Sequence, residues 1–181
     1  MFRLGLAAKY LSFAFPAVGI VLIWGYGGIL SLGQAAFFGL GSYMMAMFLK
    51  LEAAANPDSS SGTALSTFFG TEGLPDFMAW NSVEVLPWWW EPFHHVWFTI
   101  PAILIIPSVL AFALGYVNFR NRVSGVYFAI VTLSISAIMM IVIIGNQGLT
   151  GGVNGINDFK TFVGLDLDND QAKLVLYFIT C

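Results

Sequence analysis

The chain has 181 residues, of which 58% are hydrophobic and only 9% are charged, and its mean hydropathy is +0.80. A soluble domain carries roughly a quarter charged residues, so the composition excludes an ordinary soluble protein and indicates an integral membrane protein. The net charge of −3, without any basic run, argues against a nucleic-acid partner.

Three apolar blocks are long enough to cross a bilayer, which takes about 20 helical residues. Tyr10–Leu49 contains no charged side chain and is long enough to cross twice, whereas His95–Val117 and Val123–Gly145 each suffice for one crossing. Another apolar run starts at Ala172 and reaches the end of the sequence. We therefore expect an all-α polytopic membrane protein with about four complete transmembrane helices and the start of a further one. Residues 1–181 would then form one transmembrane domain, the N-terminal part of a longer protein.

The first block is interrupted by "GYGGILSLGQ", Gly25 to Gln34, where glycines cluster and polar side chains follow. Non-helical backbone at membrane depth is tolerated only where protein or a water-filled cavity satisfies it. Transporters use such discontinuous helices to present backbone groups to a solute. We therefore expect Ser31, Gly33 and Gln34 to line a solute path.

After the break, small residues recur at helical spacing. Ala35, Gly39, Ser42 and Ala46 fall on one face of a helix. Such a stripe lets a neighbouring membrane helix approach closely, so packing is the plain explanation for these positions.

Charge placement orients the helices. Residues 51–95 contain acidic side chains but no lysine or arginine, and are expected to form an extracytoplasmic loop, whereas Arg120 and Arg122 mark a cytoplasmic turn. The tryptophans of "LPWWWEPFHHVW" are expected to form an interfacial belt. The paired histidines there have no third ligand nearby, so no metal site is expected.

A second glycine cluster, "LTGGVNGI", follows the last complete apolar block. Thr150, Gly151, Gly152 and Asn154 make it a hydrogen-bonding loop that is either an ordinary turn or part of the path. The sequence has no phosphate-binding motif, no catalytic Ser-His-Asp set and no acid inside a span. We therefore expect no enzyme activity, no cofactor and no proton-driven transport.

The ordered motifs "GYGGILSLGQAAFFGLGSY", "VNFRNRVSGVYFAIVTLSISAI" and "GLTGGVNGI" resemble the permease subunits of bacterial branched-chain amino acid and urea ABC importers. The Trp-rich loop, "LPDFM" and "NDFKTFVGLDL" look most like the urea permease subunit.

The resemblance implies a multi-pass protein of the bacterial inner membrane that pairs with a second permease subunit. It also implies two cytoplasmic ATPase subunits and a periplasmic substrate-binding protein. The solute would be urea or, alternatively, a branched-chain amino acid. A passive channel or a membrane scaffold is the alternative from a different class.

Overall fold

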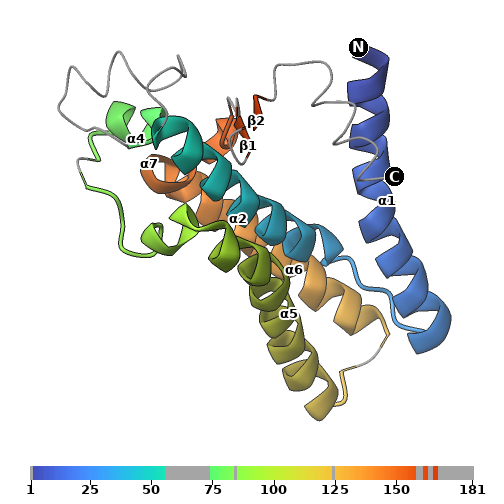
Figure 1. The fold of residues 1–181 in the computed structure, drawn as a ribbon. Helices are drawn as coiled ribbons and strands as arrows, with labels where there is room; N and C mark the ends of the chain where they lie inside the picture. Colours follow the sequence, from blue (N-terminus) through green and yellow to red (C-terminus); the bar gives the residue numbers. More distant parts are fainter. Residues whose placement is uncertain are drawn as a thin grey trace.

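Four long helices dominate the computed structural model, which describes residues 2–55, 74–83, 85–123, 125–157, 161–162 and 165–166. They are, in chain order, α1 (Phe2–Gly27), α2 (Gln34–Ala55), α5 (Val96–Arg120) and α6 (Val126–Gly145) (Figure 1). Among the described residues, three segments are long and apolar enough to cross a membrane: Lys9–Gly27, Val96–Arg120 and Val126–Gly145. The expected all-helical membrane fold is confirmed.

The uncharged block Tyr10–Leu49 forms two helices, because the chain leaves α1 after Gly27 and re-enters a helix at Gln34. The second of these, α2, runs past the block to Ala55 and so includes the charged Lys50 and Glu52.

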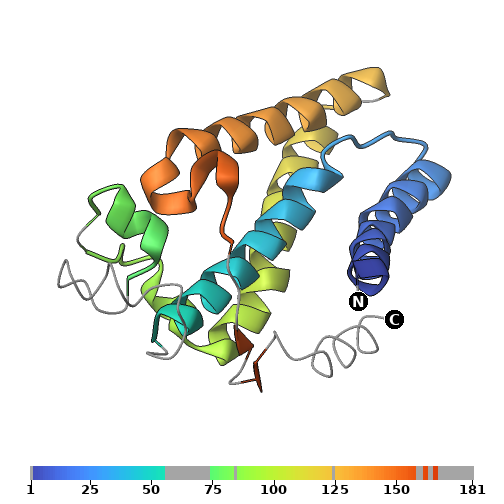
Figure 2. The ribbon, with the colours of Figure 1, turned by 90° about the horizontal axis from the view of Figure 1, so that it is seen from above.

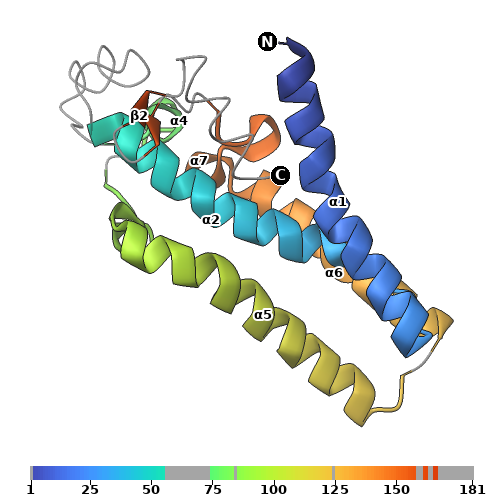
Figure 3. The same cartoon turned by 45° about the vertical axis from the view of Figure 1, so that its right-hand side comes forward.

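The other long helices are arranged around α2. The helix α2 contacts both α5 and α6, and Figures 1 and 3 show α1 to one side of this group. Figure 2 shows the same separation from above, with α1 joined to α2 through the connection after Gly27. Because of this arrangement, the break between α1 and α2 lies beside the first turns of α6.

The close approach of α2 to α5 occurs at Gly41. A Cβ atom placed there would lie 3.4 Å from the carbonyl oxygen of Ile103 and 3.8 Å from Pro107 Cγ. Pro107 has no N–H, so it cannot donate to the carbonyl oxygen four residues earlier, which is that of Ile103. The glycine thus lets the backbone of α2 cover a carbonyl group that α5 cannot satisfy itself.

The hydrophobic core lies at one end of the long helices, where short elements pack on the second half of α2. These elements are α4 (Asp76–Trp80), η1 (Glu91–His94), α7 (Gln147–Thr150) and η2 (Gly152–Asn154). The largest fully buried apolar side chains are Leu51, Met78 and Trp90, with exposed fractions of 1%, 0% and 0%. Burying an apolar side chain of this size contributes about 1.5–3 kcal/mol. Two short antiparallel strands, β1 (Thr161–Phe162) and β2 (Leu165–Asp166), follow.

The expected tryptophan belt is only partly correct. Trp88 and Trp97 are 80% and 92% exposed, as an interfacial belt requires, but Trp90 is wholly buried and packs at the centre of the core. Phe77 and Trp89 lie beside it with ring centroids 6.0 Å and 5.9 Å away. Residue spacing along an irregular segment could not distinguish the inward tryptophan from its neighbours.

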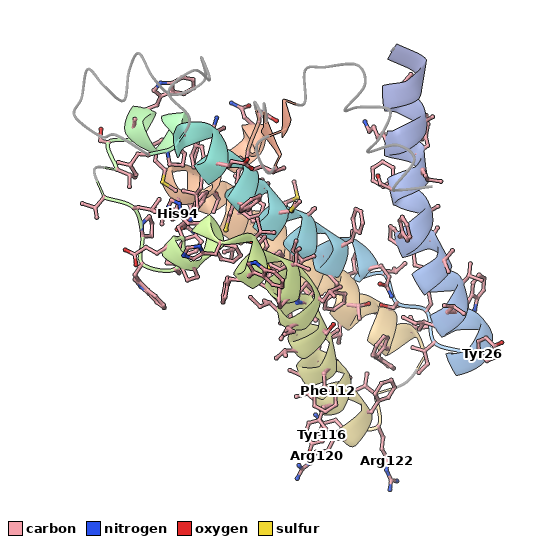
Figure 4. All side chains as sticks on the ribbon, in the orientation of Figure 1. Tyr26, His94, Phe112, Tyr116, Arg120 and Arg122 are labelled. Carbon is pink, nitrogen blue, oxygen red and sulfur yellow. The ribbon has the colours of Figure 1, made fainter. Side chains whose placement is uncertain are left out.

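The remaining surfaces of the long helices expose large apolar side chains, as a lipid-facing protein does. Tyr10, Phe112 and Ile141 are between 68% and 74% exposed. The charged residues Arg120 and Arg122 extend from the end of α5 that is remote from His94 (Figure 4). Both ends of α5 are thus marked by polar side chains, while its length is apolar.

Candidate solute path

The glycine-rich break has a local structural cause. Gly28 adopts φ +63° and its N–H donates to the carbonyl oxygen of Trp24 at 3.0 Å, which ends α1 with a left-handed cap. A residue with a Cβ atom pays a penalty in this region, so glycine is the natural residue here.

The break is attached to α6 by one side chain. The backbone N–H of Leu32 donates to Thr132 Oγ1 at 3.1 Å. Thr132 also lies 3.0 Å from the carbonyl oxygens of Phe128 and Ala129, to either of which its own hydroxyl can donate. At Gly33 a Cβ atom would lie 3.0 Å from both Thr132 Cβ and its carbonyl oxygen, so the glycine permits this close contact.

A cavity of about 380 Å³ opens beside the break, enclosed by α1, α2, α5 and α6. We call it the Gln34 cavity. Its volume falls in the range of about 300–1,000 Å³ typical of small-molecule sites. None of its lining residues is charged. Its polar lining comes from three helices and the break: Ser31, Gln34, Ser108, Asn118 and Thr132.

Three of these polar side chains keep hydrogen-bonding capacity for a solute. Within the described part of the chain, neither the Ser31 hydroxyl nor the Gln34 amide makes a hydrogen bond. The Gln34 amide oxygen lies against α1, 3.6 Å from where a Cβ of Gly19 would stand. Asn118 donates one amide N–H to the carbonyl oxygen of Leu114 at 2.7 Å, which leaves its amide oxygen free to accept. Donors and acceptors are therefore both present at the cavity wall.

The second predicted group lies at the other end of α6. Thr150 is buried, and its hydroxyl lies 2.6 Å from the carbonyl oxygen of Ile143 and 2.8 Å from that of Asn146. The Tyr43 hydroxyl of α2 donates to the Thr150 carbonyl oxygen. Gly151 adopts φ +76°, and a Cβ there would lie 2.6 Å from the carbonyl oxygen of Gly155.

Gly151 and Asn154 line a different cavity of about 310 Å³, which also contains Lys50 of α2. We call it the Lys50 cavity. Gly152 is buried against Gln147 of α7, whose Cγ would lie 2.6 Å from a Cβ at that glycine. Ser31 and Gln34 thus line one cavity and Gly151 and Asn154 line another. The other predicted path residues, Gly33, Thr150 and Gly152, line neither of the two. The helix α2 links the two cavities, because Gln34 and Lys50 lie near its two ends.

The stripe of small residues does not mediate the contact between α2 and α5. Ala35 and Ser42 are exposed, and a Cβ atom at Gly39 would meet nothing within 4 Å in the described structure. Ala46 packs at the edge of the hydrophobic core. The interhelical approach instead uses Gly41, which lies about 200° round the helix from Gly39. Packing of the stripe against a helix outside the described residues stays a prediction.

Sequence reasoning missed several polar residues that the structure brings to the cavities, among them Asn118, Thr132 and Lys50. Asn118 and Thr132 stand alone in apolar stretches, where polar residues usually bond to their own helix backbone, as both also do here. Lys50 directly follows the uncharged block, so in the sequence it indicated only where that block ends. A hydroxyl side chain within a predicted span was the available signal for Thr132, whereas Asn118 lies just after the span that was predicted to end at Val117.

The family described as "Branched-chain amino acid transport system / permease component" matches residues 2–181. The chain belongs to this permease family. It is 24% identical over 170 residues to the high-affinity branched-chain amino acid transport system permease protein LivM of Salmonella typhimurium, covering 93% of this chain and 30% of that protein. It is also 24% identical over 184 residues to LivM of Escherichia coli, covering 90% of this chain and 33% of the relative.

This permease-family chain thus spans about a third of the length of the curated relatives that it matches. No solved structure matches it. The motifs by which it resembles the family meet in space: Leu32 of the first motif contacts Thr132 of the second, and Tyr43 of the first contacts Thr150 of the third.

Proposed function

We propose that this permease chain forms part of the translocation path of an ABC importer for branched-chain amino acids in the bacterial inner membrane. The observation that carries the proposal is the Gln34 cavity, an uncharged but hydrogen-bonding space lined by residues of α1, α2, α5 and α6. Membership of the branched-chain amino acid permease family supports it.

In this proposal the protein contributes a path and no chemistry. Ser31, Gln34 and Asn118 would replace part of the hydration of a polar solute, while Phe37 and Phe128 provide apolar surface for an aliphatic side chain. Leu32 and Gly33 would position this wall through their contact with Thr132.

Transport would require further subunits. A second permease subunit would complete the path, two cytoplasmic ATPase subunits would drive it, and a periplasmic substrate-binding protein would deliver the solute. A passive channel or a scaffold, by contrast, would need none of these.

Urea is the second candidate solute. The observation that favours it is that none of the residues lining the Gln34 cavity is charged, because a small neutral amide needs only donors and acceptors. The loop motifs "LPDFM" and "NDFKTFVGLDL" also look most like a urea permease, although the second lies mostly outside the described residues.

Uptake by the complete transporter tests the proposal. The full-length permease, its partner permease, the ATPase and the binding protein are reconstituted in proteoliposomes, and entry of labelled leucine and labelled urea is measured with and without ATP. ATP-dependent entry of leucine, without entry of urea, is the expected result. Entry of urea alone would establish the second candidate, and entry without ATP would indicate a channel.

A further inference from the structure

A third cavity, of about 460 Å³, is a groove between the end of α1 and the start of α6. We call it the Trp24 groove. Its large lining side chains are all apolar and exposed: Trp24, Leu30, Leu32, Val126, Ile130 and Leu133. The indole N–H of Trp24 is the only polar side-chain group in the lining. The groove therefore suits a hydrocarbon chain and not a polar solute.

The Trp24 groove and the Gln34 cavity lie on different sides of the same segments. Leu30 and Leu32 of the break line the groove, whereas Ser31 between them lines the cavity. On α6, Leu133 lines the groove and the preceding Thr132 lines the cavity. An occupant of the groove would thus lie behind the wall of the Gln34 cavity, outside the proposed solute path.

The groove begins where two apolar spans end. The span Lys9–Gly27 ends one turn after Trp24, and the first residue of the span Val126–Gly145 lines the groove. From there Ile130 and Leu133 continue along one face of α6, so the groove extends about 10 Å into the apolar region. Tryptophan is typical of the boundary between lipid and water, where Trp24 would lie.

Arg122 lies at the same boundary. It precedes Gly125, which lines the groove, by three residues, and three residues of chain span at most about 10 Å. The Arg122 side chain is exposed and makes no ion pair or hydrogen bond within the described residues. No described residue of α5, of the turn after it or of α6 is acidic. This guanidinium therefore remains available to an anion.

Arg120, the other cation of this turn, is already held by its own helix. Its Nη1 donates to Tyr116 Oη at 2.8 Å, and its guanidinium carbon lies 5.8 Å from the centre of the Tyr116 ring. Figure 4 shows Arg120 beside Tyr116 and Arg122 extending apart from both. The two arginines thus differ in what they can bind, although they stand two positions apart.

We infer that the Trp24 groove binds a phospholipid with a negatively charged headgroup. One acyl chain would lie along Leu30, Ile130 and Leu133, and the headgroup phosphate would face Arg122, since a guanidinium donates two parallel hydrogen bonds to phosphate. A cation at the boundary followed by an apolar groove matches the order of groups in a phospholipid. A helix of another subunit would fill the groove without using the cation.

Lipid titration of the full-length permease tests this site. The protein is purified in detergent, and native mass spectrometry measures the dissociation constant of the first bound lipid. The probes are phosphatidylglycerol and phosphatidylcholine with the same acyl chains, which differ in net charge. We expect the wild type to bind phosphatidylglycerol about fivefold more tightly, the contribution typical of one arginine near an anionic headgroup.

Charge variants separate the two arginines. Arg122→Gln should abolish the preference for phosphatidylglycerol, and Arg122→Lys, which keeps the charge, should retain it. Arg120→Gln is the matched control and should also retain it, because Arg120 is bound to Tyr116. Equal constants for the two lipids in the wild type, or the same loss of preference in Arg120→Gln and Arg122→Gln, would overturn the inference.

A variant of the groove tests the acyl-chain contact. Leu133→Trp places a large ring in the groove and should weaken the binding of both lipids several-fold. Leu104→Trp is its control, because Leu104 is a similarly exposed leucine of α5 that does not line the groove. Unchanged lipid constants in Leu133→Trp would overturn the site, as expected if a helix of another subunit covers the groove instead.

Discussion

The backbone N–H of Leu32 donates a hydrogen bond to Thr132 Oγ1 at 3.1 Å, although the two residues lie 100 positions apart in the chain. One hydroxyl therefore stabilises the non-helical connection before α2 and joins it to α6. The same contact brings together two sequence motifs by which the family was recognised.

Replacing Thr132 with valine keeps the shape of the side chain and removes this acceptor. We expect a loss of about 1 kcal/mol in the free energy of unfolding, because Leu32 loses its hydrogen-bond partner. The purified permease is unfolded by titration with SDS. Ser134→Ala is the control, since within the described residues the Ser134 hydroxyl bonds only to the carbonyl oxygen of Ile130 in its own helix, at 2.8 Å. Equal losses in both variants would contradict a role of Thr132 across the break.

Replacement by leucine should have different effects on stability at the two central glycines of α2, Gly39 and Gly41. Gly41→Leu places a side chain against Ile103 and Pro107 of α5, and such overpacking costs about 1–3 kcal/mol. Gly39→Leu meets open space in the described structure and should preserve or raise stability. Thermal unfolding of the permease in detergent compares the variants. A greater loss for Gly39→Leu would show that the stripe packs against a helix outside the described residues.

Gly151→Ala should be more damaging than Gly28→Ala. Both glycines have positive φ, so both changes incur a left-handed penalty of about 1–2 kcal/mol. Only at Gly151 would the new Cβ also approach within 2.6 Å of a carbonyl oxygen, that of Gly155. The thermal unfolding midpoint should fall further for Gly151→Ala, and equal midpoints would refute the packing argument for this loop.

Gln34→Leu tests the solute path in the complete transporter. The Gln34 amide makes no hydrogen bond within the described residues, so its replacement should leave assembly with the ATPase intact. Leucine uptake should fall several-fold, or the transporter should change its selectivity among solutes, because the wall of the Gln34 cavity loses its amide. Phe38→Leu, at an exposed position outside both the cavity and the stripe of small residues, is the control and should retain uptake. Normal uptake and selectivity in Gln34→Leu would contradict the assignment of Gln34 to the path.

Cysteine labelling tests the orientation of the helices. Val85→Cys lies in the expected extracytoplasmic loop and Asn121→Cys in the turn next to Arg120, at opposite ends of α5. Both are placed in a Cys181→Ser background. An impermeant thiol reagent should label them from opposite sides of the membrane, because arginines favour the cytoplasmic side. Labelling from the same side would overturn the topology.

Helix number and the position of the break could be predicted because they depend on local composition. Gly28 caps α1 and Gly33 approaches Thr132, whereas Gly25 and Gly27 meet nothing within 4 Å, although all four contributed equally to the prediction. The observed helix ends differ by a few residues from the predicted ones where a helix continues through charged residues, such as Lys50, beyond its apolar part.

Which side of α2 meets α5 could not be predicted. Gly39 and Gly41 look alike in sequence, but their neighbours depend on the rotation of the helix, which distant residues such as Ile103 determine. The division into two cavities was equally inaccessible, because nothing local relates Lys50 to the loop that begins at Gly151.

The two contacts from α2 to the α6 region have a mechanical consequence. The residue pair Leu32–Thr132 anchors the approach to α2, and the pair Tyr43–Thr150 anchors its middle. A helix that is hydrogen-bonded to its neighbour at two points cannot shift along it or rotate against it without breaking one of the two hydrogen bonds. A conformational change that keeps both hydrogen bonds must therefore move α1 or α5 relative to α2 and α6. The non-helical link after Gly27 can act as the hinge for a movement of α1.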